Sequence, residues 1–116
     1  MKIEEKQIKM LFITEVKGLD PITVIIEDYK LGAGKIIIEC YCETWANYWG
    51  SMGNKSVGEF FCGCDNSYLF GKMGGELLAP IYDEDQQDFR DGQVAHLKRI
   101  FDAVREALDA HYAFSA

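Results

Sequence analysis

The last quarter of the chain carries a long helical repeat of apolar residues. From about Gly92 the repeat advances in steps of three and four residues, through Val94, Leu97, Phe101, Val104, Leu108 and His111. Charged residues occupy the other side, as in a helix that buries one face against a core. About 20 residues at 1.5 Å each give a helix roughly 30 Å long, enough to lie across a small sheet. The chain is therefore expected to fold in layers, with this helix covering another element.

Three runs of β-branched residues earlier in the chain predict that this other element is a sheet. They are QIKMLFITEV (7–16), ITVIIEDY (22–29) and KIIIECYCE (35–43), separated by the turn sequences KGLDP and LGAGK. In the first run Ile8, Met10, Phe12 and Val16 alternate on an apolar face, with Leu11 and Ile13 on a partly covered opposite face. Connections this short favour antiparallel hairpins. We predict an α+β fold, a three-stranded antiparallel meander followed by a helical layer including the long C-terminal helix, with residues 1–116 as a single domain.

The middle of the chain changes character. Residues 45–55, WANYWGSMGNK, are aromatic and contain glycine, so an irregular or single-turn segment is expected. Ser56 and Glu59 then match a capping box, and the apolar spacing after them predicts one helix, or two short ones broken near Asp65, ending at Gly74–Gly75. Residues 76–82 form a connection, and the acidic run 83–91 is either a loop or a frayed first helical turn.

All four cysteines lie in two Cys-x-Cys pairs, which are open to three interpretations: core side chains, a zinc site or a redox pair. Alternation along the third run places Cys40 and Cys42 on the core face, and Cys64 continues a helical apolar stripe, with Cys62 as the outlier. A zinc site would need residues 60–65 to be extended instead of helical, because thiols two residues apart diverge on a helix. A redox pair is disfavoured because neither pair is Cys-x-x-Cys. The core interpretation is preferred, and no metal site is predicted.

No other pattern in the chain predicts catalysis or a cofactor. The glycines of LGAGK fail the phosphate-loop pattern and suit a hairpin turn. The carboxylates at 83–91 lack calcium-loop spacing and suit a helix N-terminus. His96 and His111 lie fifteen residues apart on one predicted helix, which makes no catalytic set. We expect no enzymatic activity, no catalytic residues and no cofactor.

The charge balance bears on partners and location. Twelve basic and nineteen acidic residues give a net charge of -7, which repels nucleic acids and anionic membranes. An acidic surface either keeps a small protein soluble, which is the favoured interpretation, or suits a basic protein partner. The N-terminal sequence alternates charges without an apolar signal region, and no apolar run is long enough to span a bilayer. We expect a cytoplasmic protein with reduced thiols, bound directly to neither nucleic acid nor membrane.

The aromatic segment is the candidate binding site. Trp45, Tyr48, Trp49 and Met52 cluster around a glycine-bearing bend. One interpretation is that these side chains close one end of the core, since large aromatics dominate core packing. The other is a partly exposed patch that binds a partner, since Trp, Tyr and Met are enriched at interface centres.

Two stretches carry a resemblance to a known family. The run GKIIIECYCETWANYWGSMG (34–53), followed by EFFCGCDNSYL (59–69), resembles small uncharacterised proteins encoded by enterobacterial tailed phages and prophages, over about residues 18–70. The resemblance implies a small protein made in the cytoplasm of a bacterial host, and it carries over no catalytic or binding residue.

These observations favour a non-enzymatic phage or prophage accessory protein that binds a host or phage protein through Trp45, Tyr48, Trp49 and Met52. One alternative is an acidic mimic of nucleic acid that inhibits a host defence or DNA-handling protein. Another is a small zinc-stabilised module. A homodimer is also possible if one side of the long helix or the aromatic patch stays exposed.

Overall fold

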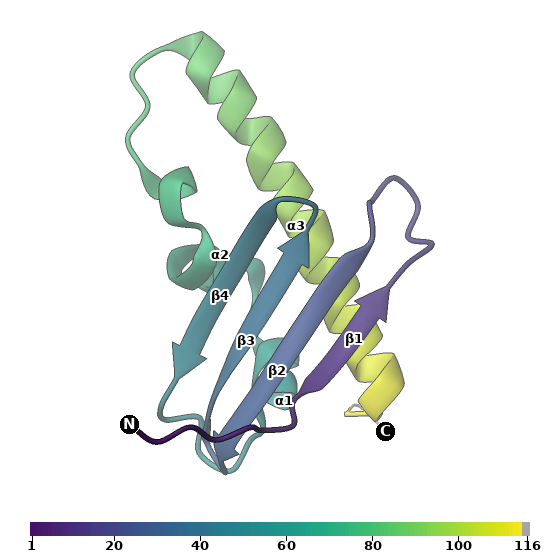
Figure 1. The fold of residues 1–116 in the computed structure, drawn as a ribbon. Coiled ribbons are helices and arrows are strands. Elements are labelled where there is room, and N and C mark those ends of the chain that lie inside the picture. The colour runs from purple at the N-terminus through teal and green to yellow at the C-terminus, as the bar shows by residue number, and fades with distance from the viewer. Residues whose placement is uncertain (115–116) are drawn as a thin grey trace.

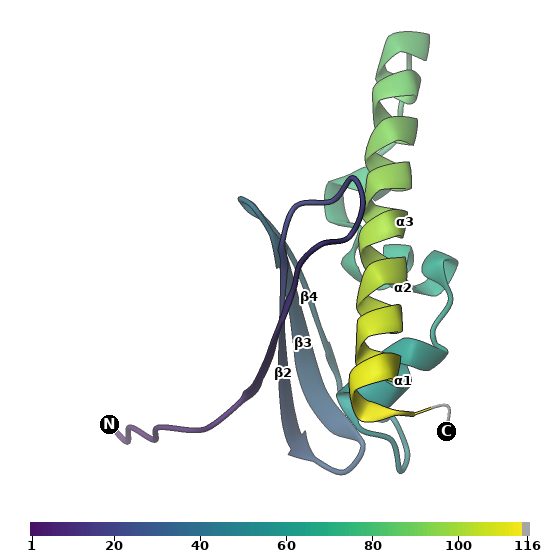
Figure 2. The ribbon, with the colours of Figure 1, turned by 90° about the vertical axis from the view of Figure 1, so that its right-hand side faces the viewer.

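A computed structural model of the protein, which describes residues 1–114, has four antiparallel strands with helices against one face of the sheet (Figure 1, Figure 2). The strands lie side by side in chain order. The elements are β1 Lys9–Ile13, β2 Ile22–Lys30, β3 Ala33–Cys40, β4 Glu43–Trp49, α1 Val57–Gly63, α2 Asn66–Met73, the 3₁₀ helix η1 Gly75–Leu78, and α3 Glu84–Tyr112. The α+β class, the antiparallel sheet and the long C-terminal helix are thus confirmed.

The prediction of three strands is wrong, because the aromatic segment forms most of a fourth. β4 pairs with β3 along its whole length, from Cys40 opposite Glu43 to Gly34 opposite Trp49. A two-residue turn joins the strands, with Tyr41 at a φ of 56°. Aromatic residues favour strands, and β3 supplies the hydrogen-bonding partner for this segment. The irregular stretch expected at 45–55 therefore begins only after Trp49.

The core fills the space between the sheet and the helices. Alternate residues of β2 and β3 point towards α3, as strand geometry requires. The predicted stripe of α3 is buried from Leu97 to Leu108, whereas Val94 is half-buried and His111 exposed. The fully buried side chains of these elements are Ile22, Val24, Ile36, Ile38, Leu97, Ile100, Phe101, Val104 and Leu108.

The two faces of strand β1 differ in burial. Leu11 pairs with Val24 of β2, so the face of Leu11 and Ile13 packs against the core. Met10 and Phe12 point the other way and are 63% and 59% exposed. The face that was expected to be only partly covered is thus the one that joins the core, and the more apolar face remains open.

The two short helices begin at side-chain caps. The Ser56 hydroxyl accepts from the Glu59 amide at 3.3 Å, which confirms Ser56 as the N-cap of α1 and Glu59 as its third residue. Asp65 starts α2 by accepting from the Tyr68 amide at 2.8 Å, so the predicted break at this residue is also confirmed. α2 ends at Met73, with Gly74 as its C-cap.

Helix α3 begins eight residues before the start expected at Gly92. The Asp83 carboxylate accepts from the Gln86 amide at 2.8 Å, and Glu84 and Asp85 lie in the first turn. Carboxylates stabilise this positive end of the helix, so the acidic run is the start of α3. The N-terminal part of α3 extends beyond the sheet (Figure 1). Within residues 1–114, no helix combines the length and the apolar character needed to cross a bilayer.

Candidate partner-binding surface

Strand β4 divides the aromatic segment between the two faces of the sheet. Trp45 and Trp49 lie opposite Ile38 and Gly34 on the helical side, and Tyr48 lies on the other side because successive side chains alternate. The four predicted binding residues therefore do not form one exposed patch.

Trp49 and Met52 belong to the core, with exposures of 7% and 5%. The Trp49 indole Nε1 donates to the Tyr68 hydroxyl at 3.0 Å, and its ring lies 5.2 Å from that of Phe60. The backbone amide of Met52 donates to the Gly32 carbonyl at 2.8 Å. The interpretation that the segment closes one end of the core is confirmed for these two side chains, and their burial removes them from any surface that a partner could reach.

Trp45 is half-buried and forms one wall of a groove with a volume of about 340 Å³. The start of β4, the junction of α2 with η1, and α3 surround it, contributing among others Glu43, Trp45, Glu76, Leu77, His96 and Leu97. This volume lies within the range of small-ligand and side-chain pockets. Sequence reasoning named only Trp45 among these residues as a candidate binding residue.

A pair of glycines shapes the groove wall opposite Trp45. A Cβ on Gly74 would lie 2.5 Å from the Phe70 carbonyl oxygen, and Gly75 has a φ of 54°. Glycine therefore allows η1 to follow α2 directly. The sequence pattern predicted this glycine pair as the end of a helix, and it predicted no other feature of this groove wall.

The groove combines apolar walls with an acidic rim. Half-buried Leu77 supplies apolar surface beside Trp45, and Glu43 and Glu76 are exposed. The polar side chains of Thr44, Gln93 and His96 also line the groove. Among the residues that the structure describes, no Lys or Arg lines the groove. A segment entering it would place an apolar side chain against Trp45 and a basic group near the two carboxylates.

The opposite side of the sheet, which we call the open face, is not covered by any helix of residues 1–114 (Figure 2). Tyr48 lies there at 57% exposure, with its ring 5.9 Å from that of Tyr29. Ile25 and Ile37 are half-buried on the same face. Of the four predicted binding residues, Tyr48 and Trp45 are thus accessible, but on opposite sides of the sheet.

The first cysteine pair straddles the end of β3. Cys40 is buried, and its thiol lies 3.9 Å from the Asp20 carbonyl oxygen. Cys42 is exposed, so its predicted place in the core is wrong. The reason is that β3 ends at Cys40 and the turn at Tyr41 breaks the alternation on which the prediction relied.

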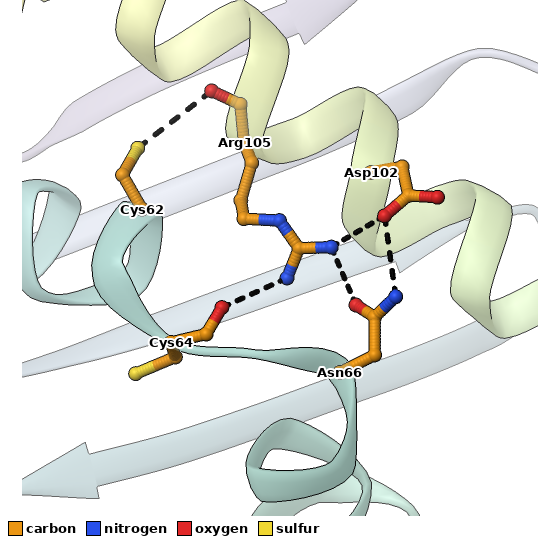
Figure 3. Close-up of polar contacts among 5 residues, drawn as sticks. All are labelled: Cys62, Cys64, Asn66, Asp102 and Arg105. Carbon is orange, nitrogen blue, oxygen red and sulfur yellow. Dashed lines mark hydrogen bonds and ion pairs between the residues drawn. The ribbon is translucent and has the colours of Figure 1, made fainter. Parts of the chain in front are cut away.

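The second pair lies where α1 meets α3, in a polar cluster centred on Arg105 (Figure 3). The Arg105 guanidinium donates to the Cys64 carbonyl at 3.0 Å and to the side-chain oxygens of Asn66 and Asp102. The Cys62 thiol points towards the Arg105 carbonyl, 3.6 Å away. We call this arrangement the Arg105 clamp, since it ties the junction of α1 and α2 to α3.

The protonation of these groups fits a structural role. Burial raises the pKa of Cys62 to about 11, and burial, followed by the charge of Asp65, also raises the pKa of Cys64. Both thiols stay protonated at neutral pH, whereas metal ligands and redox nucleophiles act as thiolates. At Asp102 burial acts to raise the pKa, but hydrogen bonds from Asn66 and Arg105 and the Arg105 charge together lower it.

Helical geometry separates Cys62 from Cys64. Cys62 is in α1 and faces α3, while Cys64 is the extended C-cap residue and its thiol donates to the Phe60 carbonyl at 3.2 Å. Both are half-buried and pack against the core, so Cys62 is not the outlier that was expected. Among residues 1–114, no group of three or more His, Cys, Asp or Glu side chains could hold a metal ion.

The two histidines lie apart from one another. His96 lines the groove, and the ring of His111 lies 4.7 Å from that of Tyr112 near the end of α3. The absence of catalytic activity, predicted above, stays a prediction.

Comparison with known proteins identifies a family. A family model described as a phage family matches residues 1–88. No curated protein and no solved structure matches the chain. The matched residues include the sheet, α1, α2 and η1, together with the first turn of α3.

Proposed function

The chain belongs to this phage family, and on that premise we propose that it is an accessory protein that binds another protein, host or phage-encoded, in the cytoplasm of an infected bacterium. The groove beside Trp45 receives the partner. The infected host is an enterobacterium. The observation that carries the proposal is the pair of exposed carboxylates, Glu43 and Glu76, beside the half-buried Trp45 ring, which matches a basic segment bearing one large apolar side chain.

Each part of the groove contributes to recognition in a different way. An indole in a partly closed pocket is a frequent energetic centre of protein interfaces, because it offers large contact area with little loss of side-chain freedom. The carboxylates of Glu43 and Glu76 attract a basic partner and reject acidic ones. The net charge of -7 also attracts a basic partner over longer distances.

The groove is also held in shape before a partner arrives. Arg90 of α3 donates to the carbonyls of Leu77 and Ala79, the latter at 3.0 Å, which fixes the end of η1. The Arg105 clamp fixes the start of α2 to the same helix. A preorganised site loses less conformational entropy on binding, so such contacts raise affinity.

Affinity capture from an infected-host lysate tests the proposal. The wild type, Trp45→Ala and a control, Tyr82→Ala, are compared as bait; Tyr82 is 88% exposed and lies outside the groove lining. We expect one protein to be retained by the wild type and by Tyr82→Ala and to fall at least tenfold with Trp45→Ala, in line with a loss of about 1.4 kcal/mol or more at an interface centre.

Two further baits test the charge of the rim. Glu43→Gln and Glu76→Gln should each weaken capture, and added salt should weaken the wild type in the same direction. Retention unchanged by Trp45→Ala, or lost equally with Tyr82→Ala, would refute the groove as the binding site.

The acidic start of α3 favours a second candidate, the nucleic-acid mimic. Glu84, Asp88 and Asp91 are exposed and share one face of the helix by their spacing of four and three residues. A mimic predicts that Asp88→Asn weakens capture, that duplex DNA competes for the partner, and that Trp45→Ala has no effect. The same baits therefore separate the two candidates.

A further inference from the structure

The open face carries a continuous apolar row from edge to edge of the sheet. The strand registers place Met10 opposite Ile25, Ile25 opposite Ile37, and Ile37 opposite Ala46. Phe12 adds a further aromatic side chain at the β1 edge, at 59% exposure. The helices all pack on the other side of the sheet (Figure 2). An apolar row that no helix covers is a candidate interface.

The N-terminal residues 1–8 leave the sheet on this same side. They run outward from the base of β1 without joining the helical layer (Figure 2). Ile3 is 85% and Ile8 50% exposed. This extended arm therefore adds apolar side chains beside the open face.

The charges of the open face are complementary to their own image under a two-fold rotation. Glu27 of β2 lies directly across from Lys35 of β3, with their charged groups 3.8 Å apart. If a second copy packs face to face, related by an axis parallel to the strands and midway between β2 and β3, each β2 lies over the partner's β3. Glu27 then meets Lys35 of the other copy, and Ile25 meets Ile37.

The same rotation also satisfies the next polar row. Thr23 and Glu39 are paired across β2 and β3, so each Glu39 lies over the other copy's Thr23, whose hydroxyl can donate to the carboxylate. A single axis thus matches acid with base, carboxylate with hydroxyl, and isoleucine with isoleucine. Such self-complementarity is what a two-fold interface requires.

We propose that the open face is the interface of a homodimer, in which two sheets pack face to face and the N-terminal arms reach across to the other copy. Four strands about 4.8 Å apart and about seven residues long give a face of roughly 19 by 23 Å, or about 440 Å² per copy as a flat area. Two such faces give about 900 Å², and side-chain relief and the arms raise the buried area past the roughly 1,000 Å² of a stable interface.

This dimer places the helical layers outward, so the two Trp45 grooves point away from each other. The homodimer and the groove use opposite sides of the sheet, and one can exist without the other. A dimer would present two grooves and bind a repetitive partner more tightly than a single copy does.

Charge-swap pairing tests the interface. Glu27→Lys gives a chain with two lysines in the central row, and Lys35→Glu gives a chain with two glutamates. Each variant should repel its own copy, whereas an equimolar mixture should pair, because lysine then meets glutamate at both crossings. A role confined to the pair within one chain would not produce association on mixing.

The readout is molar mass by light scattering and native mass spectrometry at about 10 and 100 µM. We expect twice 13.2 kDa for the wild type, half that mass for each variant alone, and the heterodimer on mixing. Glu106→Lys and Lys98→Glu on α3 make the same charge changes on the helical side and should leave the dimer intact. Circular dichroism checks that each variant is folded. A monomeric wild type at 100 µM, or variants that stay dimeric alone, would overturn the proposal.

Discussion

Replacing Arg105 by methionine tests whether the Arg105 clamp holds the helical layer together. The guanidinium donates to the Cys64 carbonyl at 3.0 Å, to Asn66 and to Asp102, joining the α1–α2 junction to α3. Methionine keeps most of the apolar stem of the side chain, so the change removes the polar contacts and leaves the packing largely intact.

The expected loss follows from the three contacts. The part-buried Cys64 carbonyl loses its donor, at a cost of about 1 kcal/mol, and loss of the charged hydrogen bond to Asn66 costs about 1 kcal/mol more. The Asp102 pair adds about 0.3 kcal/mol, because Asp102 is half exposed and water screens the interaction. The free energy of unfolding should fall by about 2 kcal/mol, and Tm by about 8 °C for a chain of this size.

Equilibrium unfolding in urea, followed by tryptophan fluorescence, measures this loss. Buried Trp49 should report the unfolding of the core. All proteins are compared at one concentration, because dimer formation would add to apparent stability. Lys98→Met, at an exposed position of the same helix, is the control and should change stability by less than about 0.5 kcal/mol. A loss below about 0.5 kcal/mol for Arg105→Met would refute the clamp.

Two other predictions concern the thiols and the strand glycine. Iodoacetamide at pH 8 should alkylate exposed Cys42 well before Cys62, because the Cys62 pKa of about 11 keeps that thiol neutral. The rate of Cys62 alkylation should rise as the pH approaches 11. Equal alkylation rates of the two cysteines in a peptide map would contradict this. Gly34→Ala should destabilise the fold by about 2 kcal/mol or more, since a Cβ there would lie 2.4 Å from both the Glu27 carbonyl oxygen and a Val57 methyl. A Tm within about 2 °C of the wild type would contradict this, because it would show that the neighbouring atoms move to make room for the methyl group.

The helical half of the fold was readable from local signals. The capping box at Ser56, the break at Asp65 and the apolar stripe of α3 each depend on residues within one or two turns. Such signals need no knowledge of the rest of the molecule. The sequence left the acidic run open between a loop and a first helical turn, because the run has no apolar period, although its carboxylates are typical of a helix N-terminus.

Strand β4 was missed because its inward face is not uniformly apolar. Half-buried Asn47 lies between Trp45 and Trp49, and glycine follows directly at position 50. Pairing with β3 decides the structure of this segment, and that pairing depends on the turn at Tyr41. A positive φ at a tyrosine is uncommon, so no local pattern indicates that the alternation ends before Cys42.

The candidate groove could not be predicted for a related reason. Its walls come from β4, the α2–η1 junction and α3, which meet only in the tertiary structure. Trp45 was named from composition, but the same reasoning named buried Trp49 equally, since aromatic residues serve cores and interfaces alike. Only the assignment of residues to the two faces of β4 separates them.

Site-specific photocrosslinking tests the central claim, that the Trp45 groove receives a partner, most directly. A benzophenone amino acid replaces Gln93, which lines the groove, or Tyr82, which does not, in protein produced in infected cells. The account predicts a covalent adduct with one partner from position 93 that disappears in a Trp45→Ala background. An adduct from position 82 alone, or one from position 93 that persists in that background, would contradict it.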